Sequence, residues 1–292
     1  MNKTYFITSD VHSFYKPFKT ALDKAGFDEK NKDHILVING DIFDRGPDSI
    51  LIYDYLKSLP KDRRILIRGN HEDMIGDIVK RGYFQSHDYH NCSDKTILQF
   101  YKRGYDEKET DTHTIIQYFK SLKITDWFQS DEWVNYLEIG NYIITHAFLP
   151  LEDKKEGSVY YNDLDSLSYI PDWRELPVDS PLWENARWGC PFTLFYSFFK
   201  EEKEKNKILV CGHWHVSDFH ASLEHKYNDY SIYCRDQLIG LDACTALSNR
   251  CNILIINSDN GKCYDGESKK EFDFKKNSTS EKPCFGLESR AA

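Results

Sequence analysis

Residues 35–46 read ILVINGDIFDRG, and residues 65–72 read ILIRGNHE. In both stretches an apolar, β-branched run is followed by one polar residue, then by glycine and by acidic, amide or imidazole side chains. Continuous apolar runs of this length are typical of strands that are buried on both faces of a sheet. The order of strand and polar cluster therefore indicates both the class of fold and the place of a functional site.

Other apolar runs extend this pattern along the chain. Buried strands are predicted at residues 5–8, 35–38, 65–67, 142–145, 208–210, 238–241 and 253–256. Helical segments separate the first three strands: Pro17 opens one that stops at Gly26, and Pro47 opens one that stops before Pro60. Strands that alternate with helices predict crossover units and a largely parallel α/β sheet, covered by helices on both faces.

The composition limits the class of protein. The 292 residues are 40% hydrophobic and 29% charged, which provides enough apolar surface for a globular fold. With 38 Lys and Arg against 47 Asp and Glu, the net charge is −9, and the chain has no long basic run. Nucleic acid is therefore not an expected partner. A phosphate-bearing substrate is compatible with this charge, because bound divalent cations reverse the local field.

Targeting signals and cysteine usage favour a cytoplasmic protein. The N-terminus, MNKTYFITSD, has no apolar stretch of signal-peptide length, and no run approaches the ~18 apolar residues of a membrane helix. The eight cysteines form no CxxC pair, and none lies in the first 91 residues. Free thiols in a reducing compartment are expected, and a membrane partner is not.

The polar residues that follow the strands have the composition of a metal site. Ligands bind at the carboxyl ends of strands in open α/β sheets, so five of the polar clusters are expected to converge. The candidate metal ligands are Asp10, His12, Asp41, Asn70, His146, His213 and His215. Carboxylate, imidazole and amide donors accept several first-row metals. These donors are too many for one ion, so we expect two ions about 3.5–4 Å apart that share a carboxylate and activate a water.

Three further residues suit phosphoryl transfer. The guanidinium of Arg45 matches phosphate oxygens and stabilises charge that develops on them. A histidine beside the metals protonates a leaving oxygen when a carboxylate holds its other ring nitrogen. His71 and Asp44 are the candidates for this pair.

The ordered motifs carry a family resemblance. Asp10-x-His12, the GDIFDRG and GNHE blocks, a lone His146 and the GHWH block at 212–215 resemble the calcineurin-like metallophosphoesterases. GDxxDRG followed by RGNHE is similar to the phosphoprotein phosphatase branch, which includes bacterial and phage serine/threonine phosphatases and diadenosine tetraphosphate hydrolases. The resemblance covers residues 5–257 and implies a four-layer α/β/β/α sandwich with a helical insertion and two metals between its sheets.

The resemblance also implies a division of the ligands. One metal would take Asp10, His12, Asp41 and His215, and the other would take Asp41, Asn70, His146 and His213. Asp41 would bridge the two ions, and His71 would be the general acid with Asp44 behind it. Members of the family usually have glycines where this chain has Ser9 and Ser13, so the first turn is expected to differ locally.

The phosphate-binding residues implied by the resemblance are Arg45, Arg68, Asn70 and Arg187. An arginine at the start of a tight turn also braces that turn by hydrogen bonds, which is the alternative role for Arg68. The family supplies a further arginine after the lone histidine. Arg187, in LWENARWG, is the candidate, and Arg174 is its competitor.

The expected domain organisation follows from the remaining sequence. Residues 97–102 and 115–122 are helical windows in a region without a clear strand, and a helix is predicted from Pro191 to about Lys205. A DNG turn at 259–261 predicts a hairpin. We expect a catalytic domain at residues 1–266, a helical insertion or cap at 72–140, an irregular and helical insertion at 150–207, and a polar tail at 267–292.

The resemblance implies a dimetal phosphoesterase that hydrolyses phosphomonoesters, most specifically a serine/threonine phosphoprotein phosphatase. A metal-bridging hydroxide would attack phosphorus while His71 protonates the leaving oxygen. Two Mn²⁺ ions are expected, with Fe/Zn, Ni or Co as alternatives. The partner would be a phosphorylated protein or a small phosphoester, and the oligomeric state is left open. The alternatives are a bis(5'-nucleosyl)-tetraphosphate hydrolase, a nucleic-acid end phosphatase and a non-catalytic scaffold that binds metal or phosphorylated ligands.

Overall fold

Two β-sheets form the centre of the computed structural model, which describes residues 3–105, 111–154, 164–199, 204 and 206–274. The first sheet has the order β13-β12-β1-β2-β3-β4, with strands Cys263–Asp265, Leu254–Asn257, Thr4–Thr8, His34–Asn39, Arg64–Ile67 and Trp133–Val134. Strands β1 to β4 are parallel, and β12 and β13 pair antiparallel at one edge.

The second sheet contains the later strands. Its order is β10-β11-β9-β6-β5, with strands Tyr233–Arg235, Leu238–Gly240, Ile208–Cys211, Tyr142–Thr145 and Tyr136–Ile139. Strands β6, β9 and β11 are parallel, and β5 and β10 pair antiparallel at the two edges. All seven predicted strand segments are present. The strand pattern alone predicted one largely parallel sheet, whereas the structure has two mixed sheets, as the family resemblance implied.

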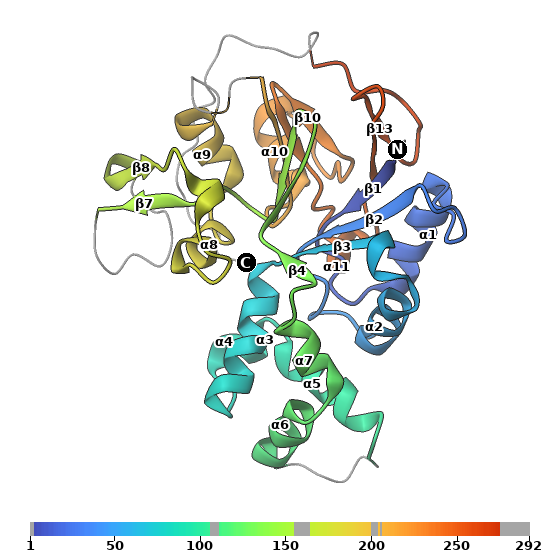
Figure 1. The fold of residues 1–292 in the computed structure, drawn as a ribbon, viewed down its shortest axis with the longest axis vertical. Coiled ribbons are helices and arrows are strands. Elements are labelled where there is room, and N and C mark those ends of the chain that lie inside the picture. The colour runs from blue at the N-terminus through green and yellow to red at the C-terminus, as the bar shows by residue number, and fades with distance from the viewer. Residues whose placement is uncertain (1–2, 106–110, 155–163, 200–203, 205, 275–292) are drawn as a thin grey trace.

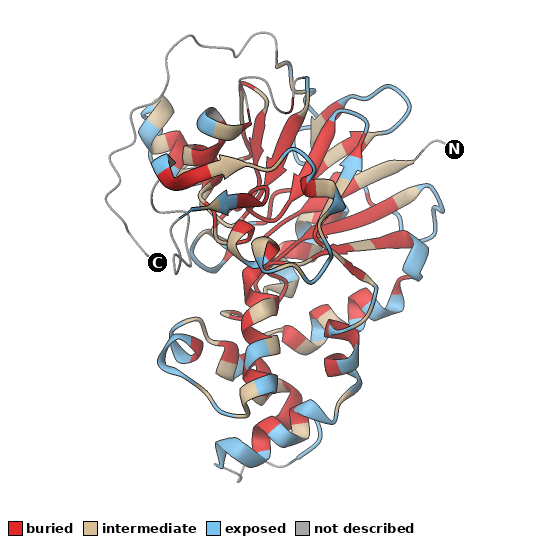
Figure 2. Ribbon diagram, turned by 60° about the vertical axis from the view of Figure 1, so that its left-hand side comes forward, coloured by how far each residue is buried: buried red, intermediate tan, exposed pale blue. Residues whose placement is uncertain are grey.

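The two sheets pack face to face. Alternate side chains of each strand point in opposite directions, so Ile7 and Val37 of the first sheet meet Ile144 and Val210 of the second in one buried cluster. The neighbouring residues Phe6 and Leu36 point outward and join a different cluster. Figure 2 shows the strands as largely buried. This alternation explains why the strand segments are apolar on both faces.

Helices cover the outer face of each sheet, which gives four layers. The first sheet carries α1 (Tyr15–Ala25) and α2 (Ser49–Ser58). The second carries α8 (Pro181–Ala186), α9 (Pro191–Phe198) and α10 (Val216–Glu224). Figure 1 shows α1 and α2 on one side of the sheets and α8 and α9 on the other. The expected α/β/β/α sandwich is confirmed.

The helical insertion forms one end of the molecule (Figure 1). It consists of α3 (Asn70–Arg81), α4 (Ser86–His90), α5 (Ser93–Lys102), α6 (Thr112–Lys120) and α7 (Lys123–Phe128). The helices stop at Phe128, so the expected range of 72–140 was too long: it also contains β4 and β5. These strands gave little signal, because β4 has two residues and β5 is mostly part-exposed.

The described residues between 150 and 207 hold a shorter helix than the one predicted from Pro191 to about Lys205. They contain a small sheet of β7 (Leu151–Asp153) and β8 (Leu167–Tyr169), and 3₁₀ turns at Leu164–Ser166 and Trp173–Glu175. Helix α9 ends at Phe198, and residues 200–203 and 205 lie outside the described residues.

The C-terminal region contains the predicted hairpin, between β12 and β13, with Gly261 at φ +65°. The expected tail begins too early. Phe272 donates its backbone N–H to Cys263, and its side chain packs against the core between the sheets. Residues 275–292 lie outside the described part. The other short elements are 3₁₀ turn Lys61–Arg63 and helix α11 (Thr245–Ser248). No helix among the described residues is long and apolar enough to cross a membrane.

Candidate functional site

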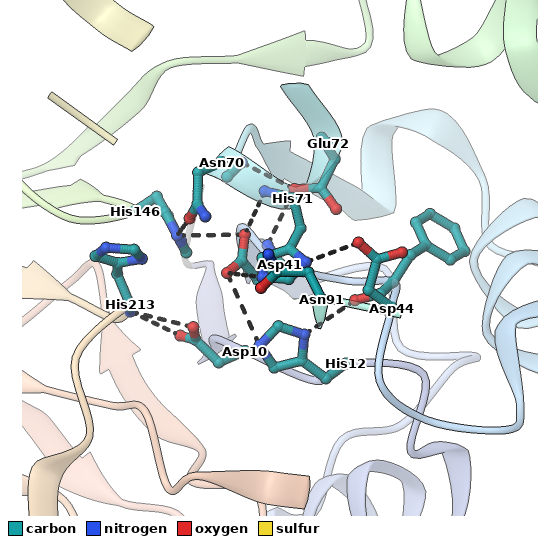
Figure 3. A network of polar contacts seen from close by, with 12 residues as sticks. Asp10, His12, Asp41, Asp44, Asn70, His71, Glu72, Asn91, His146 and His213 are labelled. Carbon is teal, nitrogen blue, oxygen red and sulfur yellow. Dashed lines mark hydrogen bonds and ion pairs between the residues drawn. The ribbon is translucent and has the colours of Figure 1, made fainter. Parts of the chain in front are cut away.

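The loops that follow β1, β2, β3, β6 and β9 meet at one edge of the sandwich. Figure 3 shows Asp41 at the centre, with His146 and His213 on one side and His12 and Asp44 on the other. The sequence placed each of these residues directly after a strand. The convergence of the strand ends therefore brings together residues that are far apart in the chain, as in the hydrogen bond from the backbone N–H of His213 to the carboxylate of Asp10, 203 residues away.

Left-handed backbone conformations recur in these loops. Non-glycine residues with positive φ include Asp10 (54°), His12 (49°), Asp41 (52°), Asp44 (71°), Arg45 (61°) and His213 (65°). Such conformations cost about 1–3 kcal/mol each and cluster at functional sites. Gly40 also has a positive φ, and a Cβ there would lie 2.3 Å from Nδ1 of His146. These loops thus adopt unfavourable backbone conformations that direct their side chains into the site.

Asp41 faces several imidazoles at once. Its Oδ1 lies 3.3 Å from Nε2 of His146, and its Oδ2 lies 3.8 Å from Nε2 of both His12 and His71. Two groups with potential ligand atoms within 4.8 Å of one another occur in the described part of the chain: His12, Asp41 and His71, and Asp41, His146 and His213. Both groups share Asp41.

The second group contains three of the four residues expected at one metal. The fourth, Asn70, has its Oδ1 2.9 Å from Nε2 of His146. The other predicted set is brought together less closely. Asp10 accepts the backbone N–H of His213 at 3.0 Å, and His215 lies 3.9 Å from Oδ2 of Asp242. His71, expected as the acid, takes their place beside His12 and Asp41.

Backbone carbonyls orient two of the imidazoles. Nδ1 of His12 donates to the carbonyl of Phe43 at 3.0 Å, and Nδ1 of His146 donates to the carbonyl of Asn39 at 2.9 Å. Both rings therefore turn Nε2 toward Asp41. This arrangement is typical of histidines that bind metals, because the carbonyl fixes the ring and raises the basicity of the ligating nitrogen.

The charges in the site fit divalent cations. Burial raises the pKa of Asp10 well above its usual value, and the nearby carboxylates of Asp242 and Asp41 add to the shift. Burial opposes a charged imidazole at His146, but Asp41 and Asp10 raise its pKa to about 10. Burial lowers the pKa of His213 to about 3, and neighbouring His146 adds to this. Without metal, the buried carboxylates and imidazoles compete for protons. A bound divalent cation would take the place of these protons and balance the negative charge of the carboxylates.

His71 and Asp44 form a buried pair (Figure 3). Nδ1 of His71 lies 2.7 Å from Oδ2 of Asp44. Burial alone would lower the pKa of His71, but the charge of Asp41 and the hydrogen bond to Asp44 raise it. Asp44 also accepts hydrogen bonds from Ser93 at 2.5 Å and Thr96 at 2.7 Å. A held, protonated imidazole is suited to proton donation from Nε2.

Glu72 is an important site residue that the sequence analysis did not assign. It is fully buried, and its carboxylate accepts the backbone N–H groups of Gly69 (2.9 Å), Asp41 (3.0 Å) and Ile42 (3.0 Å). Burial raises its pKa to about 7, with a further contribution from Asp41. Glu72 thereby joins the loops after β2 and β3. The available signal was its place in the GNHE block, at the third position of α3.

Asp242, which was also missed, lies after β11 and is buried. It accepts the backbone N–H of Cys244 at 2.7 Å and faces His215. The sequence signal was again position, because Asp242 directly follows a predicted strand. The two serines that replace glycines are buried: Ser9 donates to the carbonyl of Asn39 at 2.7 Å, and Ser13 shares a hydrogen bond with Ser49.

The candidate arginines lie in different surroundings. Arg45 has no hydrogen bond or ion pair among the described residues, and its charge helps to lower the pKa of buried His12. Arg68 donates to the carbonyl of Phe128, and its guanidinium lies 5.7 Å from the ring centre of Trp133. The contacts of Arg68 are those of a bracing residue, whereas the guanidinium donors of Arg45 have no partner among the described residues.

The two later arginines are both engaged. Arg187 is buried and donates to Asp73 at 2.5 Å and to Asn135 at 3.0 Å. The next residue, Trp188, packs edge-on against His213, with ring centres 5.7 Å apart. Arg174 instead binds Glu138 and Glu204. Arg187 is therefore the one of the two that adjoins the site.

Imidazole and carboxylate donors at the strand ends of a two-sheet sandwich define the class of metallophosphoesterases. The chain belongs to the calcineurin-like phosphoesterase family, whose model matches residues 3–234. A crystal structure of a cold-active protein-tyrosine phosphatase from a psychrophilic Shewanella species shares the fold. Its TM-score is 0.51 at 15% identity, over 93% of this chain and 80% of that one.

Several curated relatives are named as bis(5'-nucleosyl)-tetraphosphatases. A stretch of 69 residues is 49% identical to the symmetrical bis(5'-nucleosyl)-tetraphosphatase of Buchnera aphidicola subsp. Acyrthosiphon pisum (strain 5A) and covers 24% of each chain. The first of these relatives are thus matched over about a quarter of their length.

Other relatives match over longer segments, and two of them illustrate this. The symmetrical enzyme of Wigglesworthia glossinidia brevipalpis is 25% identical over 72% of this chain and 85% of its own. The asymmetrical bis(5'-nucleosyl)-tetraphosphatase PrpE of Bacillus subtilis (strain 168) is 22% identical over 70% of this chain and 83% of its own.

Proposed function

We propose that this protein is a dimetal-dependent hydrolase of bis(5'-nucleosyl)-tetraphosphates. The carrying observation is the pair of donor groups that share Asp41, directly beside the buried His71–Asp44 pair. The relatives favour this substrate over the phosphoprotein expected from the motifs, since those matched over most of their length are named for it. The proposed reaction is hydrolysis of one phosphoanhydride bond of a dinucleoside tetraphosphate.

The proposed metal ligands follow the family pattern. One ion would be held by Asp10, His12, Asp41 and His215, and the other by Asp41, Asn70, His146 and His213. We propose Mn²⁺ as the ion. When bound, such ions neutralise phosphate charge and lower the pKa of water toward neutrality. The buried carboxylates and carbonyl-oriented imidazoles described above supply the donor chemistry that these ions require.

The chain's own residues bind the phosphates and move the proton. Arg45 keeps its guanidinium donors for phosphate oxygens, because none is used by the described residues. We propose secondary phosphate contacts for Arg68, Asn70 and Arg187. In the structure Arg68 donates to Phe128 and Arg187 to Asp73 and Asn135, so both arginines would have to exchange a protein partner for phosphate. His71 delivers a proton from Nε2 to the departing nucleotide oxygen, and Asp44 holds the opposite nitrogen. Symmetrical cleavage would yield two nucleoside diphosphates, and asymmetrical cleavage would yield a nucleoside triphosphate and a monophosphate.

A substrate comparison on one preparation tests this proposal. Metal-stripped full-length protein is reloaded with Mn²⁺ and supplied separately with diadenosine tetraphosphate, a phosphoserine peptide and a 3'-phosphorylated RNA. We expect the dinucleotide to give the highest kcat/KM, with nucleotide products identified by ion-exchange chromatography. Faster release of phosphate from the peptide would establish the phosphoprotein phosphatase instead. Absence of metal-dependent turnover on all three substrates would contradict the proposed function and both of its alternatives as a phosphoprotein or nucleic-acid end phosphatase.

A further inference from the structure

We propose that Ser93 and Thr96, in the first turn of α5, are positioning residues that hold Asp44 against His71. This inference rests on the proposed function, because it extends the proton-donating role given to His71. All four residues are buried, with exposures of 0–1%. The helical insertion would thus form part of the acid apparatus in addition to covering one end of the sandwich.

Both carboxylate oxygens of Asp44 accept hydrogen bonds from neighbouring side chains. Its Oδ2 accepts from Nδ1 of His71 at 2.7 Å and from Ser93 at 2.5 Å. Its Oδ1 accepts from the hydroxyl of Thr96 at 2.7 Å. The Thr96 oxygen also accepts the backbone N–H of Asp44 at 3.0 Å. Thr96 therefore makes two hydrogen bonds to Asp44, one to its backbone and one to its side chain. The carboxylate is the acceptor in all three of its side-chain hydrogen bonds.

The direction of these bonds fixes the proton on His71. An ionised carboxylate only accepts hydrogen bonds, so with Asp44 accepting from both hydroxyls we assign the Nδ1 atom of His71 as the donor in their shared hydrogen bond. The ring is then turned with Nε2 toward Asp41, at 3.8 Å from Oδ2. Without the hydroxyls, Asp44 gains freedom to rotate, and the imidazole loses the support that directs Nε2.

The same face of α5 also holds the loop that carries Asp44. Ser93, Thr96 and Gln99 are spaced three residues apart, which places them on one side of the helix. Gln99 donates to the carbonyl of Gly46 at 3.1 Å and accepts the N–H of Ser49 at 2.8 Å. The polar row therefore contacts the loop from Asp44 to Ser49 along its length. This row fits the positioning role better than general packing, because apolar residues on the adjacent face already anchor α5.

The test compares substrates that differ in their need for an acid. The variant Ser93→Ala/Thr96→Val is assayed with an alkyl phosphate, whose leaving oxygen must be protonated, and with p-nitrophenyl phosphate, whose leaving group needs no proton. We expect kcat on the alkyl phosphate to fall about 10- to 100-fold, with KM and bound Mn²⁺ unchanged. On p-nitrophenyl phosphate the loss should stay within about threefold. A double variant that carries Thr96→Ser in place of Thr96→Val keeps a hydroxyl at this position and should recover most of the alkyl phosphate rate.

A matched control removes a hydroxyl elsewhere in the insertion. Thr125 is also buried, but its hydroxyl donates to the carbonyl of Phe119 and does not contact the site. Thr125→Val should therefore leave the ratio of the two substrates unchanged. Equal losses on both substrates, or none on either, would overturn the positioning role of Ser93 and Thr96. Should the double variant fail to fold, Ser93→Ala alone is held to the same criterion.

A spectroscopic readout makes the test independent of turnover. In a ¹⁵N-edited proton spectrum of the metal-free protein, the Nδ1–H of His71 should be visible and slow to exchange in the wild type. It should broaden or shift in Ser93→Ala/Thr96→Val, and an unchanged signal would refute the inference. Because neither arm uses a dinucleotide, an enzyme that prefers another phosphoester refutes the proposed substrate without deciding the role of these hydroxyls.

Discussion

At the residue scale, two aspartates of one motif have different surroundings. Asp41 and Asp44 are three residues apart, and both have positive φ. Asp41 faces three imidazole Nε2 atoms, which suits a shared metal ligand. Asp44 contacts one imidazole and two hydroxyls, which suits a residue that orients a proton donor. Within GDIFDRG, the first aspartate thus suits a ligand shared by two metals, and the second suits a residue that orients His71.

His71→Asn tests the acid role directly. Asparagine keeps a polar side chain of similar reach but has no proton to deliver from Nε2. We expect the variant to retain bound Mn²⁺ and to lose about 10²- to 10³-fold in kcat on alkyl phosphates, with a much smaller loss on p-nitrophenyl phosphate. Steady-state kinetics and metal analysis on the same sample provide the check. Equal rates in variant and wild type on the alkyl ester would remove His71 from this role.

Glu72→Gln tests the carboxylate that joins two active-site loops. Glutamine places an amide NH₂ against backbone N–H groups that now find a carboxylate oxygen. The unpaired donors should cost about 2 kcal/mol of unfolding free energy. Urea denaturation at neutral pH measures this loss, with exposed Glu175→Gln as the control. A Glu72 variant as stable as the control would show that these bonds do not stabilise the site.

At the element scale, the sequence correctly predicted the strands that are buried on both faces. The apolar segments appeared as strands because both of their faces are covered. Helix α1 ended at Gly26 as expected, and the structure shows this glycine in the left-handed conformation. Strands β4 and β5 were missed because they are short or part-exposed, so their pairing depends on neighbours distant in sequence. Ser93 and Thr96 were missed for a related reason, since hydroxyls on a helix resemble a solvated face until tertiary packing buries them.

The junction of β3, α7 and β4 should make stability depend on pH. Burial opposes the charge of Glu132, but hydrogen bonds from Arg64, Lys61 and Trp127 lower its pKa to about 2. Because this pKa lies below the ordinary value of 4.5, the contribution is complete above about pH 5 and is lost as the pH falls toward 2.

Glu132→Gln measures that contribution. We expect the variant to be less stable than the wild type by about 1 kcal/mol at pH 7, a modest value because the lysine partners are exposed to solvent. The difference in unfolding free energy should shrink on acidification and vanish near pH 2. A difference that is constant from pH 7 to pH 3 would assign the effect to packing.

At the scale of the whole molecule, the site lies where the two sheets meet. Asp41 and Asn70 follow strands of the first sheet, whereas His146 and His213 follow strands of the second. An ion held by this set connects loops that are otherwise joined mainly through the apolar core between the sheets. Because the unfolded chain cannot present these donors together, metal binding should stabilise the folded state.

Thermal unfolding of metal-stripped protein, titrated with MnCl₂, tests this coupling. At 100 times Kd, binding contributes about 2.7 kcal/mol per site, which corresponds to a rise in Tm of roughly 5 °C or more for a chain of this size. Asp41→Asn removes the carboxylate that both donor groups share, so its Tm should respond little to Mn²⁺. His113→Gln, at an exposed position outside the site, should respond like the wild type. An equal rise in Asp41→Asn would place the stabilising ion elsewhere.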